Sequence, residues 1–435
     1  MIALDRMLYR LSGLLVRPSA LRHLRHLTGV ENLPDAGPFI LIANHSSFFD
    51  HFFLETVVFA VSGRRTYFLT KSEAFSTPLR RMWHKSVGAI PVERDAPSRE
   101  TIRAISSVLS DGEIICIYPE GTRGPGWPLL PFKDGAFHFA LRGNVPIVPV
   151  GLVDAATVLP RKAVVPRRAK AAVHFGPVLV PPTGGPRRER LTALRDAGQS
   201  VVKGLVEAGR AVSDVDRRQA ARRIAARATE QIENLLAHAE TDGAGSRQPN
   251  LKPLRLLLRL ATINDPASVE VAVCRLRLDG LEALAARFPR RLTMAVSLRR
   301  RANRLLRRDP DLDMAHYVLG RWHLNMPAAL GGRRSLAIAH LREAVRVGDP
   351  DGRYAMALAE ALVRARRWVD AEAVLVDVIA CAPADARGQR RAARAQALRG
   401  TLAAQAVPAF ARPAEILRVP MMPTAALPAP SVPAP

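Results

Sequence analysis

Residues 38–53 read PFILIANHSSFFDHFF and join an apolar run to a polar turn and a second apolar segment. A short apolar run bounded by a proline and a polar turn is typical of a buried β-strand. His45 and Asp50 follow the run, and four phenylalanines surround them. In α/β sheets the functional groups collect where strands end, so this titratable pair marks a candidate site.

Three later segments resemble the first run, and each is bounded by turn residues: 113–121, 145–152 and 171–180. The stretches between the first three runs have helical spacing, as in residues 98–110. Strands that alternate with helices predict an α/β domain in which helices flank a mixed or largely parallel sheet.

Apolar residues recur at helical spacing between Leu4 and Val16, and basic residues occupy the other side of that helix. Residues 1–28 are therefore expected to form an amphipathic, mildly basic helical segment. Such a helix could lie in a membrane interface or pack on its own domain.

The second half of the chain has a different pattern. A long polar helix is expected from residue 213 to about 240, which ends an α/β domain at 29–240. Residues 241–250 (TDGAGSRQPN) are polar and contain glycine and serine, so they are interpreted as a linker.

Residues 251–406 are rich in Ala, Leu and Arg, and three helical segments there end at Pro310, Pro350 and Pro383. A helix pair that repeats at intervals near 34 residues resembles tetratricopeptide-type repeats, and a plain helical bundle is the alternative. The Pro- and Ala-rich residues 407–435 cannot bury a core and are expected to be disordered.

The 64 Lys and Arg residues exceed the 39 Asp and Glu residues, for a net charge of +25. Such a surface suits nucleic acid, anionic lipid headgroups or phosphorylated substrates, although a biased genome composition explains it equally well. Aromatic residues make up only 5% of the chain, which is few for base stacking. The sequence also lacks the signatures of zinc, RNA-recognition or helix-turn-helix modules. We therefore expect no nucleic acid partner.

The chain has three cysteines, Cys116, Cys274 and Cys381, and no Cys-x-x-Cys pair. This spacing argues against a disulfide framework and a structural zinc site, and it fits a reducing compartment. No run approaches the roughly 18 apolar residues of a membrane span, and the first residues do not resemble a secretory signal.

Five sequence blocks follow the His45–Asp50 turn in a fixed order: TKSEAF (70–75), GAIPVERD (88–95), YPEGTRG (118–124), FKDGAFHFA (132–140) and VPIVPVGL (145–152). With the His-x4-Asp turn, this series resembles the glycerolipid acyltransferases, the lysophosphatidic acid acyltransferases and their relatives. The resemblance covers about residues 29–181. The chain departs mildly from the family pattern at Gly124, where Ser is frequent, at Tyr118, where Phe is common, and at Glu93, where Asp is common.

The resemblance implies that His45 is the catalytic base and that Asp50 orients it. Acyl transfer from a thioester needs a base to take the proton of an alcohol, and a histidine with a pKa near neutrality suits this role. The carboxylate would fix the imidazole tautomer and stabilise the imidazolium, as in a Ser-His-Asp triad whose serine is replaced by the substrate hydroxyl. A helix-capping Asp and a buried structural His are the alternative.

The resemblance also implies that basic side chains bind the acceptor phosphate. Arg123 would follow a strand and lie near His45, where a guanidinium can bind a phosphate through two hydrogen bonds. Lys71 and Arg94 occupy positions where the family has basic residues, and ordinary surface charges are the alternative for these two.

Glu120, Gly121 and Thr122 belong to the same motif as Arg123. Glu120 is expected to organise the loop through hydrogen bonds, and Gly121 is expected to permit its turn. The four phenylalanines could line the mouth of an acyl-chain tunnel or form the core face of a helix.

From the resemblance we expect an O-acyltransferase that uses acyl-CoA or acyl-carrier protein and acylates a lysophospholipid, most simply 1-acylglycerol-3-phosphate. Another lyso-lipid, such as a lyso-aminolipid, is an alternative acceptor. A membrane-bound helical scaffold with an inactive acyltransferase-like domain is the alternative from another class. We expect no bound cofactor and no metal, a peripheral location on the cytoplasmic side of an anionic membrane, and a protein partner for the helical half.

Overall fold

A computed structural model describes residues 2–93, 98–241, 250–349, 351–382 and 386–406. The chain divides into two compact units, Met1–Trp322 and His323–Pro435, which are described separately. The predicted disordered tail at 407–435 lies outside the described residues, as do residues 242–249 of the predicted linker.

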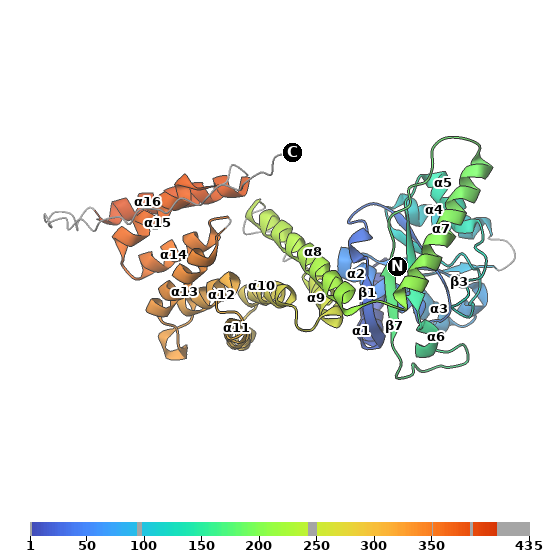
Figure 1. The fold of residues 1–435 in the computed structure, drawn as a ribbon, viewed down its shortest axis with the longest axis horizontal. Coiled ribbons are helices and arrows are strands. Elements are labelled where there is room, and N and C mark those ends of the chain that lie inside the picture. Colours follow the sequence, from blue (N-terminus) through green and yellow to red (C-terminus); the bar gives the residue numbers. More distant parts are fainter. Residues whose placement is uncertain (1, 94–97, 242–249, 350, 383–385, 407–435) are drawn as a thin grey trace, which may run out of the picture. The chain divides into compact units, whose positions relative to one another are not determined.

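The first unit contains a seven-stranded sheet in the order β1-β7-β6-β2-β5-β3-β4 (Figure 1). Its strands are β1 (Leu24–Thr28), β2 (Phe39–Ala43), β3 (Thr66–Lys71), β4 (Ala89–Val92), β5 (Ile114–Ile117), β6 (Ile147–Val153) and β7 (Ala171–Phe175). The four predicted strands are confirmed as β2, β5, β6 and β7. The short strands β1, β3 and β4 were not predicted.

The sheet is mixed, as predicted. Strands β2 to β6 run in one direction, whereas β7 is antiparallel to β6 and β1 is parallel to β7. The chain segments that follow β2, β3, β5 and β6 therefore begin at one edge of the sheet, which we call the carboxyl edge.

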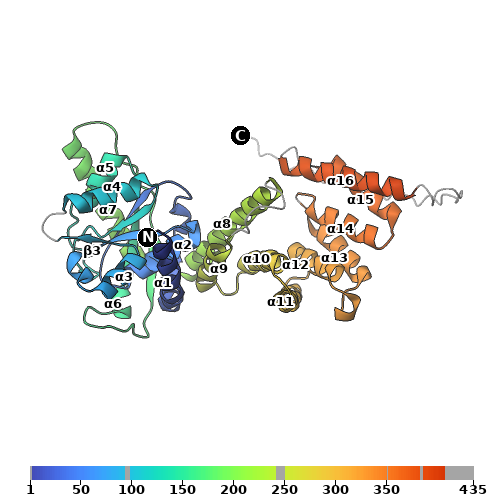
Figure 2. The ribbon, with the colours of Figure 1, turned by 180° about the vertical axis from the view of Figure 1, so that it is seen from behind.

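Alternate residues of β2 enter two different cores. Phe39 and Leu41 pack on one face, with the helices α2 and α9, whereas Ile40 and Ile42 pack on the other. Helices thus cover both faces of the sheet (Figures 1 and 2). The first face carries α2 (Asp50–Ser62), α8 (Asp214–Thr241) and α9 (Lys252–Asn264), and the second carries α4 (Arg99–Ser110), α5 (Gly135–Gly143) and α7 (Arg187–Gly209).

Helix α1 (Ile2–His23) confirms the helix expected near the N-terminus, and it packs against α2 and α3 (Pro78–Ser86). Residues 24–28 of the predicted helical segment form β1 instead. Both α1 and α3 expose large apolar side chains: Met7, Leu11, Leu14 and Leu15 on α1, and Leu79, Met82 and Trp83 on α3.

The division between the two units does not fall at the predicted linker. Helices α9 and α10 (Val269–Ala285) follow the linker, and yet Leu257 and Cys274 are buried in the same core as the sheet. Helix α9 also contacts α2, α8 and β1. The α/β unit therefore includes helices that the sequence assigned to a separate domain, because the apolar face of α9 packs on the sheet and on α2, and α10 packs on α8 and α9.

The described residues after α10 are mainly helical, as predicted. Helices α11 (Arg290–Leu306) and α12 (Asp313–Asn325) lead to the second unit, which contains α13 (Arg334–Val347), α14 (Arg353–Arg364), α15 (Trp368–Ala380) and α16 (Ala386–Ala406). Consecutive helices from α13 to α16 pack against each other. The short helices are α6 (Ala155–Val158) and the 3₁₀ turns η1 (Val30–Asn32), η2 (Ser72–Phe75) and η3 (Ala328–Leu330). Among the helices that the structure describes, none is long and apolar enough to cross a bilayer.

Candidate active site

His45 and Asp50 form a hydrogen-bonded pair at the carboxyl edge. His45 Nδ1 lies 2.8 Å from Asp50 Oδ2, and the Asp50 side chain is fully buried. The same oxygen accepts hydrogen bonds from the backbone N–H groups of Ser46, at 2.8 Å, and Ser47, at 2.9 Å. A carboxylate oxygen with these donors can only accept from the imidazole, so Nδ1 carries the proton. The other ring nitrogen, Nε2, is left available as a base.

The local fold explains this geometry. Asp50 is the first residue of α2, where free backbone N–H groups and the helix dipole favour a negative charge. The turn between β2 and α2 is only six residues long, so the pair forms within one local segment. His45 itself is mostly buried, with 15% of its side chain exposed.

Glu120 connects the turn after β2 to the turn after β5. Its Oε1 accepts a hydrogen bond from the backbone N–H of His45 at 2.9 Å, and its Oε2 accepts one from Leu130 at 3.2 Å. The N–H of Gly124 donates to the carbonyl of His45 at 2.7 Å. Burial raises the pKa of Glu120, and the hydrogen bonds from the N–H groups of His45 and Leu130 oppose that rise. Both backbone groups of the candidate base are therefore held by one loop.

Gly121 and Thr122 complete this loop. Gly121 has φ +70°, a left-handed conformation that glycine adopts without strain, and the Lys133 side chain packs over the position that a Cβ would take. Thr122 is exposed. Lys133, which follows Phe132 in the fourth sequence block, is thus a further cation near the candidate site.

An aromatic wall covers one side of the candidate base. The Tyr118 ring stacks on the His45 ring, with 4.1 Å between the centroids and 17° between the planes. The His51 ring lies 6.4 Å from His45, centroid to centroid. Burial raises the pKa of Tyr118 well above its usual value and lowers the pKa of His51 to about 3. Both neighbours are therefore uncharged at neutral pH. Sequence analysis did not single out His51.

Arg123 lies next to this pair and has unused hydrogen-bonding capacity. Its guanidinium carbon lies 3.8 Å from the centre of the Phe48 ring, and its buried Nη1 has no hydrogen-bond partner among the described residues. Burial lowers the pKa of Arg123, and the charge of Arg161 lowers it further. Two guanidinium groups that repel one another beside a candidate base form a receptive site for an anion.

Arg161 lies in the segment of residues 159–170, which follows β6 and α6. We call this segment the 159–170 loop. Sequence analysis missed this loop, although its run of cations after a predicted strand was a usable signal. Ser47 Oγ donates to the Leu159 carbonyl at 2.8 Å, which fixes the loop to the catalytic turn. Val164 and Val165 are 93% and 73% exposed. The loop contains five cations and no acidic residue: Arg161, Lys162, Arg167, Arg168 and Lys170.

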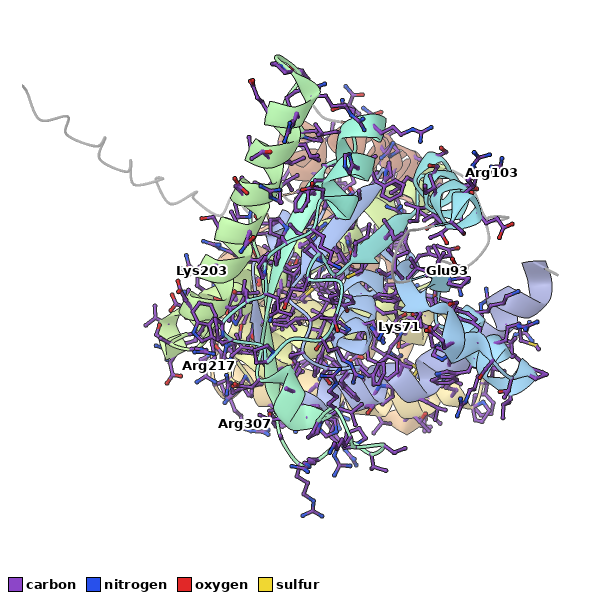
Figure 3. The ribbon with its side chains drawn as sticks, turned by 90° about the vertical axis from the view of Figure 1, so that its right-hand side faces the viewer. Lys71, Glu93, Arg103, Lys203, Arg217 and Arg307 are labelled. Atoms are coloured by element: carbon purple, nitrogen blue, oxygen red, sulfur yellow. The ribbon has the colours of Figure 1, made fainter. Side chains whose placement is uncertain are left out.

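Lys71 is the last residue of β3, so it also lies at the carboxyl edge (Figure 3). Arg94 lies outside the described residues. Of the residues proposed from sequence, the structure therefore groups His45, Asp50 and Arg123 with the Glu120–Gly121–Thr122 loop, and it places Lys71 at the same edge.

The four phenylalanines have different surroundings. Phe49 and Phe53 are buried in the core, with 2% and 1% of their surface exposed, and Phe52 packs against that core. Phe48 is 49% exposed and lies under Arg123. Phe52 and Phe53 thus belong to the core face of α2, and Phe49 packs in the same core directly before the helix.

Within the described ranges, no group of three or more His, Cys, Asp or Glu side chains could hold a metal ion. The three cysteines are free: Cys116 and Cys274 are buried, and Cys381 is exposed.

Residues 25–153 match the sequence model of a protein family that is described as Acyltransferase. The chain is 30% identical to the 1-acyl-sn-glycerol-3-phosphate acyltransferase BAT2, chloroplastic, of Brassica napus, over 31% of this chain and 38% of that protein. It is 31% identical to the 1-acyl-sn-glycerol-3-phosphate acyltransferase of Bacillus subtilis, over 27% of this chain and 57% of that protein. The chain thus spans well under two thirds of the length of these relatives.

Among solved structures, the 1-acyl-sn-glycerophosphate acyltransferase PlsC from Thermotoga maritima matches with 25% identity and a TM-score of 0.36. That match covers 43% of this chain and 73% of the Thermotoga chain. The sequence matches to the family and to its curated members show that the chain contains an acyltransferase domain related to the 1-acyl-sn-glycerol-3-phosphate acyltransferases.

Proposed function

We propose that the protein transfers a fatty acyl group from a thioester donor, acyl-CoA or acyl-carrier protein, to the hydroxyl of a lysophospholipid. The observation that carries the proposal is the 2.8 Å hydrogen bond from His45 Nδ1 to buried Asp50, which leaves Nε2 available as a base. The His45–Asp50 pair lies in a domain related to acyltransferases, beside cations that suit a phosphate.

The pair supports a direct transfer. His45 Nε2 takes the proton of the acceptor hydroxyl while the oxygen attacks the thioester carbonyl. The C–O bond forms, the C–S bond breaks, and the imidazolium returns the proton to the leaving thiolate. The substrate hydroxyl takes the place that a serine has in a Ser-His-Asp triad, so no acyl-enzyme is required.

The surroundings of His45 favour this cycle. The negative charge of Asp50 stabilises the imidazolium that forms when His45 accepts the proton. Tyr118 and His51 stay neutral and exclude water from one side of the ring, which strengthens the His45–Asp50 interaction. Glu120 and Gly124 fix the backbone of His45, so the base keeps its position.

The acceptor that best suits this edge carries a phosphate. Arg161 is close enough to Arg123 that its charge lowers the pKa of Arg123. Lys71 is the last residue of β3, at the same carboxyl edge. An anion between the two guanidinium groups would remove their repulsion. We therefore propose 1-acylglycerol-3-phosphate as the first acceptor to test, with phosphatidic acid as the product.

A lipid acceptor requires access from a membrane. The exposed apolar side chains of α1 and α3, together with Val164 and Val165 in the basic 159–170 loop, support a peripheral attachment to an anionic surface. From the sequence we also propose that this surface is the cytoplasmic side of a membrane.

The tetratricopeptide-like interpretation of residues 251–406 is also a proposal. The neighbour-to-neighbour packing of α13 to α16 supports it for the second unit. Helices α9 and α10 share the hydrophobic core of the first unit instead, so a repeat array that recruits a protein partner would begin after them.

The first experiment mixes purified protein with lysophosphatidic acid and a series of acyl-CoA species, and it follows free thiol release and lipid product. His45→Ala is the test variant, and His138→Ala, an exposed histidine on α5, is the matched control. We expect wild type and His138→Ala to form product and His45→Ala to lose it. Equal thiol release by all three proteins would contradict the role of His45.

If no protein forms product, a lyso-aminolipid and an acyl-carrier protein donor are tested next. A wild-type protein that binds vesicles but acylates none of these acceptors would contradict the enzyme proposal and favour the scaffold alternative.

A further inference from the structure

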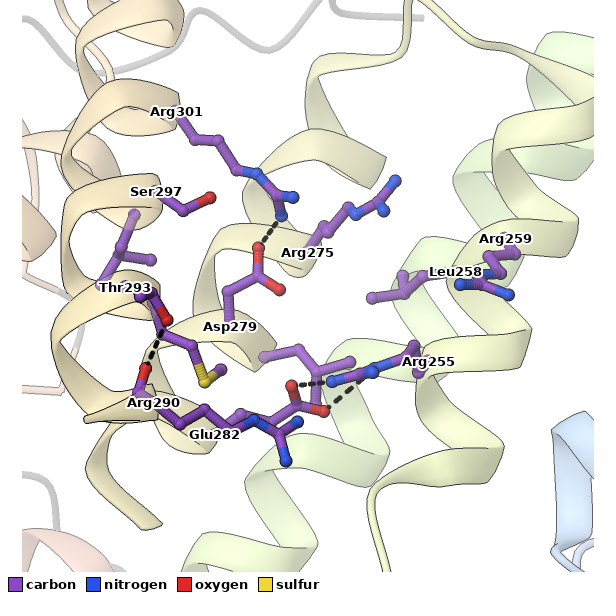
Figure 4. Close-up of a pocket in the computed structure, with 13 residues that line it drawn as sticks. Arg255, Leu258, Arg259, Arg275, Asp279, Glu282, Arg290, Thr293, Ser297 and Arg301 are labelled. Atoms are coloured by element: carbon purple, nitrogen blue, oxygen red, sulfur yellow. Dashed lines mark hydrogen bonds and ion pairs between the residues drawn. The ribbon is translucent and has the colours of Figure 1, made fainter. Parts of the chain in front are cut away.

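A second concave site lies in the first unit, away from the residues of the acyltransferase motifs. Helices α9, α10 and α11 line an open pocket of about 360 Å³ (Figure 4). Its walls carry five arginines, which define what we call the arginine pocket: Arg255 and Arg259 on α9, Arg275 on α10, and Arg290 and Arg301 on α11. The volume is in the range of pockets that bind small molecules.

Two carboxylates also line the arginine pocket, and both already have partners. Glu282 accepts a hydrogen bond from Arg255 Nε at 3.1 Å and a second one from Arg255 Nη2. Asp279 accepts one from Arg301. Figure 4 shows these pairs as dashed lines that hold Arg255 and Arg301 at the walls. The acidic residues thus orient two of the arginines and leave the other three to be explained.

Arg259, Arg275 and Arg290 have no ion pair through their side chains among the described residues. Asp279 is influenced by the charges of both Arg301 and Arg275, so one carboxylate serves two guanidinium groups. Five cations therefore face two anions in one hollow. Like charges gathered from three helices disfavour their packing unless an anion joins them.

Neutral side chains complete a surface suited to phosphate. The hydroxyl of Ser297 lines the pocket beside the guanidinium groups, whereas the hydroxyl of Thr293 donates to the Arg290 carbonyl at 2.9 Å. Leu258 and Leu278 form the apolar part of the pocket. Guanidinium forks bind phosphate oxygens through paired hydrogen bonds, and the Ser297 hydroxyl adds a further donor. This combination differs from a solvated basic surface because the groups converge on one cavity.

We propose that the arginine pocket binds a small molecule with two or more phosphoryl groups. The three uncompensated guanidinium charges match the roughly three negative charges of a diphosphate better than the lower charge of one phosphate. The ligand would connect α9, α10 and α11. This proposal does not depend on the proposed acyl transfer.

The experiment measures pyrophosphate binding to the full-length protein by titration calorimetry, and it follows the melting temperature at the same pyrophosphate concentrations. The test variant is Arg259→Gln with Arg290→Gln. The matched control is Arg304→Gln with Arg307→Gln, which removes the same charge from exposed residues that line a neighbouring open hollow. Since neither Arg259 nor Arg290 has a carboxylate partner in the part of the chain that the structure describes, both double variants should fold, and their melting temperatures without ligand check this.

We expect pyrophosphate to bind wild type and control with similar affinity and to raise their melting temperatures. The test variant should lose affinity at least about tenfold, because it lacks two charge-assisted contacts. Inorganic phosphate should bind more weakly than pyrophosphate.

An equal loss in the control would show a general basic surface and overturn the proposal, as would failure of wild type to bind pyrophosphate at millimolar concentration. A last binding experiment replaces pyrophosphate by vesicles that contain phosphatidic acid. Arg259- and Arg290-dependent binding to vesicles, without binding of pyrophosphate, would assign the pocket to a lipid headgroup and overturn the small-molecule proposal.

Discussion

The side chain of Asn264 on α9 makes two hydrogen bonds to the backbone of Leu27 on β1. Its Oδ1 accepts from the Leu27 N–H at 2.9 Å, and its Nδ2 donates to the Leu27 carbonyl at 2.7 Å. Among the described residues, strand β1 is an edge of the sheet and pairs with β7 alone, so the amide occupies the place of a missing strand. Helix α9 thus closes an edge that would otherwise be open to another chain.

The first prediction concerns this contact. Asn264→Ala should lower the free energy of unfolding by about 2–4 kcal/mol, because two buried backbone groups of Leu27 lose their partners. Denaturant unfolding measures the change. Gln219→Ala, at an exposed position on α8, is the control and should change stability by less than about 0.5 kcal/mol. An unchanged midpoint for Asn264→Ala would show that α9 does not stabilise the edge strand.

The second prediction concerns Asp50. Asp50→Asn should lower kcat about 10²–10⁴-fold with a small change in KM, because a neutral amide can leave Nδ1 unprotonated and cannot stabilise the imidazolium. Initial rates of acyl transfer measure this. Asp134→Asn, a partly exposed carboxyl at the start of α5, is the control. A change confined to KM would mean that Asp50 positions substrate rather than the base.

The third prediction concerns Arg161. Arg161→Gln should raise KM for the phosphate-bearing acceptor about tenfold or more and leave kcat nearly unchanged, since the loss of one charge-assisted contact weakens acceptor binding. Arg168→Gln removes the same charge from the 159–170 loop and is expected to behave like wild type. Equal effects of the two variants would indicate attraction by net charge rather than a contact with phosphate.

The fourth prediction concerns the membrane. Val164→Asp with Val165→Asp should reduce sedimentation with anionic vesicles several-fold, because two exposed apolar side chains become charged. Val180→Asp is a suitable control, since Val180 is 70% exposed and follows β7, which leads away from the carboxyl edge. Vesicle binding that is insensitive to both changes would place the membrane contact elsewhere, for example on α1 and α3.

The fifth prediction concerns acid stability. Burial lowers the pKa of His174 to about 3, and the charges of His26 and Arg25 lower it further. Between this value and the ordinary pKa near 6.5, the unfolded chain binds a proton that the folded chain does not. The free energy of unfolding should therefore fall as pH drops from 6.5 towards 3, by roughly 1.4 kcal/mol per pH unit for this residue.

His174→Gln tests this dependence. Glutamine can keep a hydrogen bond to Thr28, whose Oγ1 lies 2.8 Å from His174 Nδ1, but it does not titrate. Denaturant unfolding at several pH values should show a shallower slope for the variant over this range. His138→Gln, at an exposed position, should leave the slope as in wild type. A His174→Gln slope equal to that of wild type would contradict the prediction.

Local patterns in the sequence are sufficient for part of the site. The apolar run of β2 places Phe39 and Ile40 on opposite faces, and the turn that follows brings His45 to Asp50 within six residues. These relationships depend on strand periodicity and on the start of one helix, which are properties of short segments. The strands β1, β3 and β4 escaped prediction because they are only partly buried and lack the continuous apolar run of β2, β5, β6 and β7, which are buried along their whole length.

Only the tertiary structure decided which distant segments meet. Asn264 contacts Leu27 across 237 residues, and Glu120 reaches the His45 backbone across 75 residues. Arg161 approaches Arg123 because β6 runs in the same direction as β2 and β5. A sequence specifies such contacts only through the burial of many side chains at once, so a motif can identify the base while the fold alone assembles its surroundings.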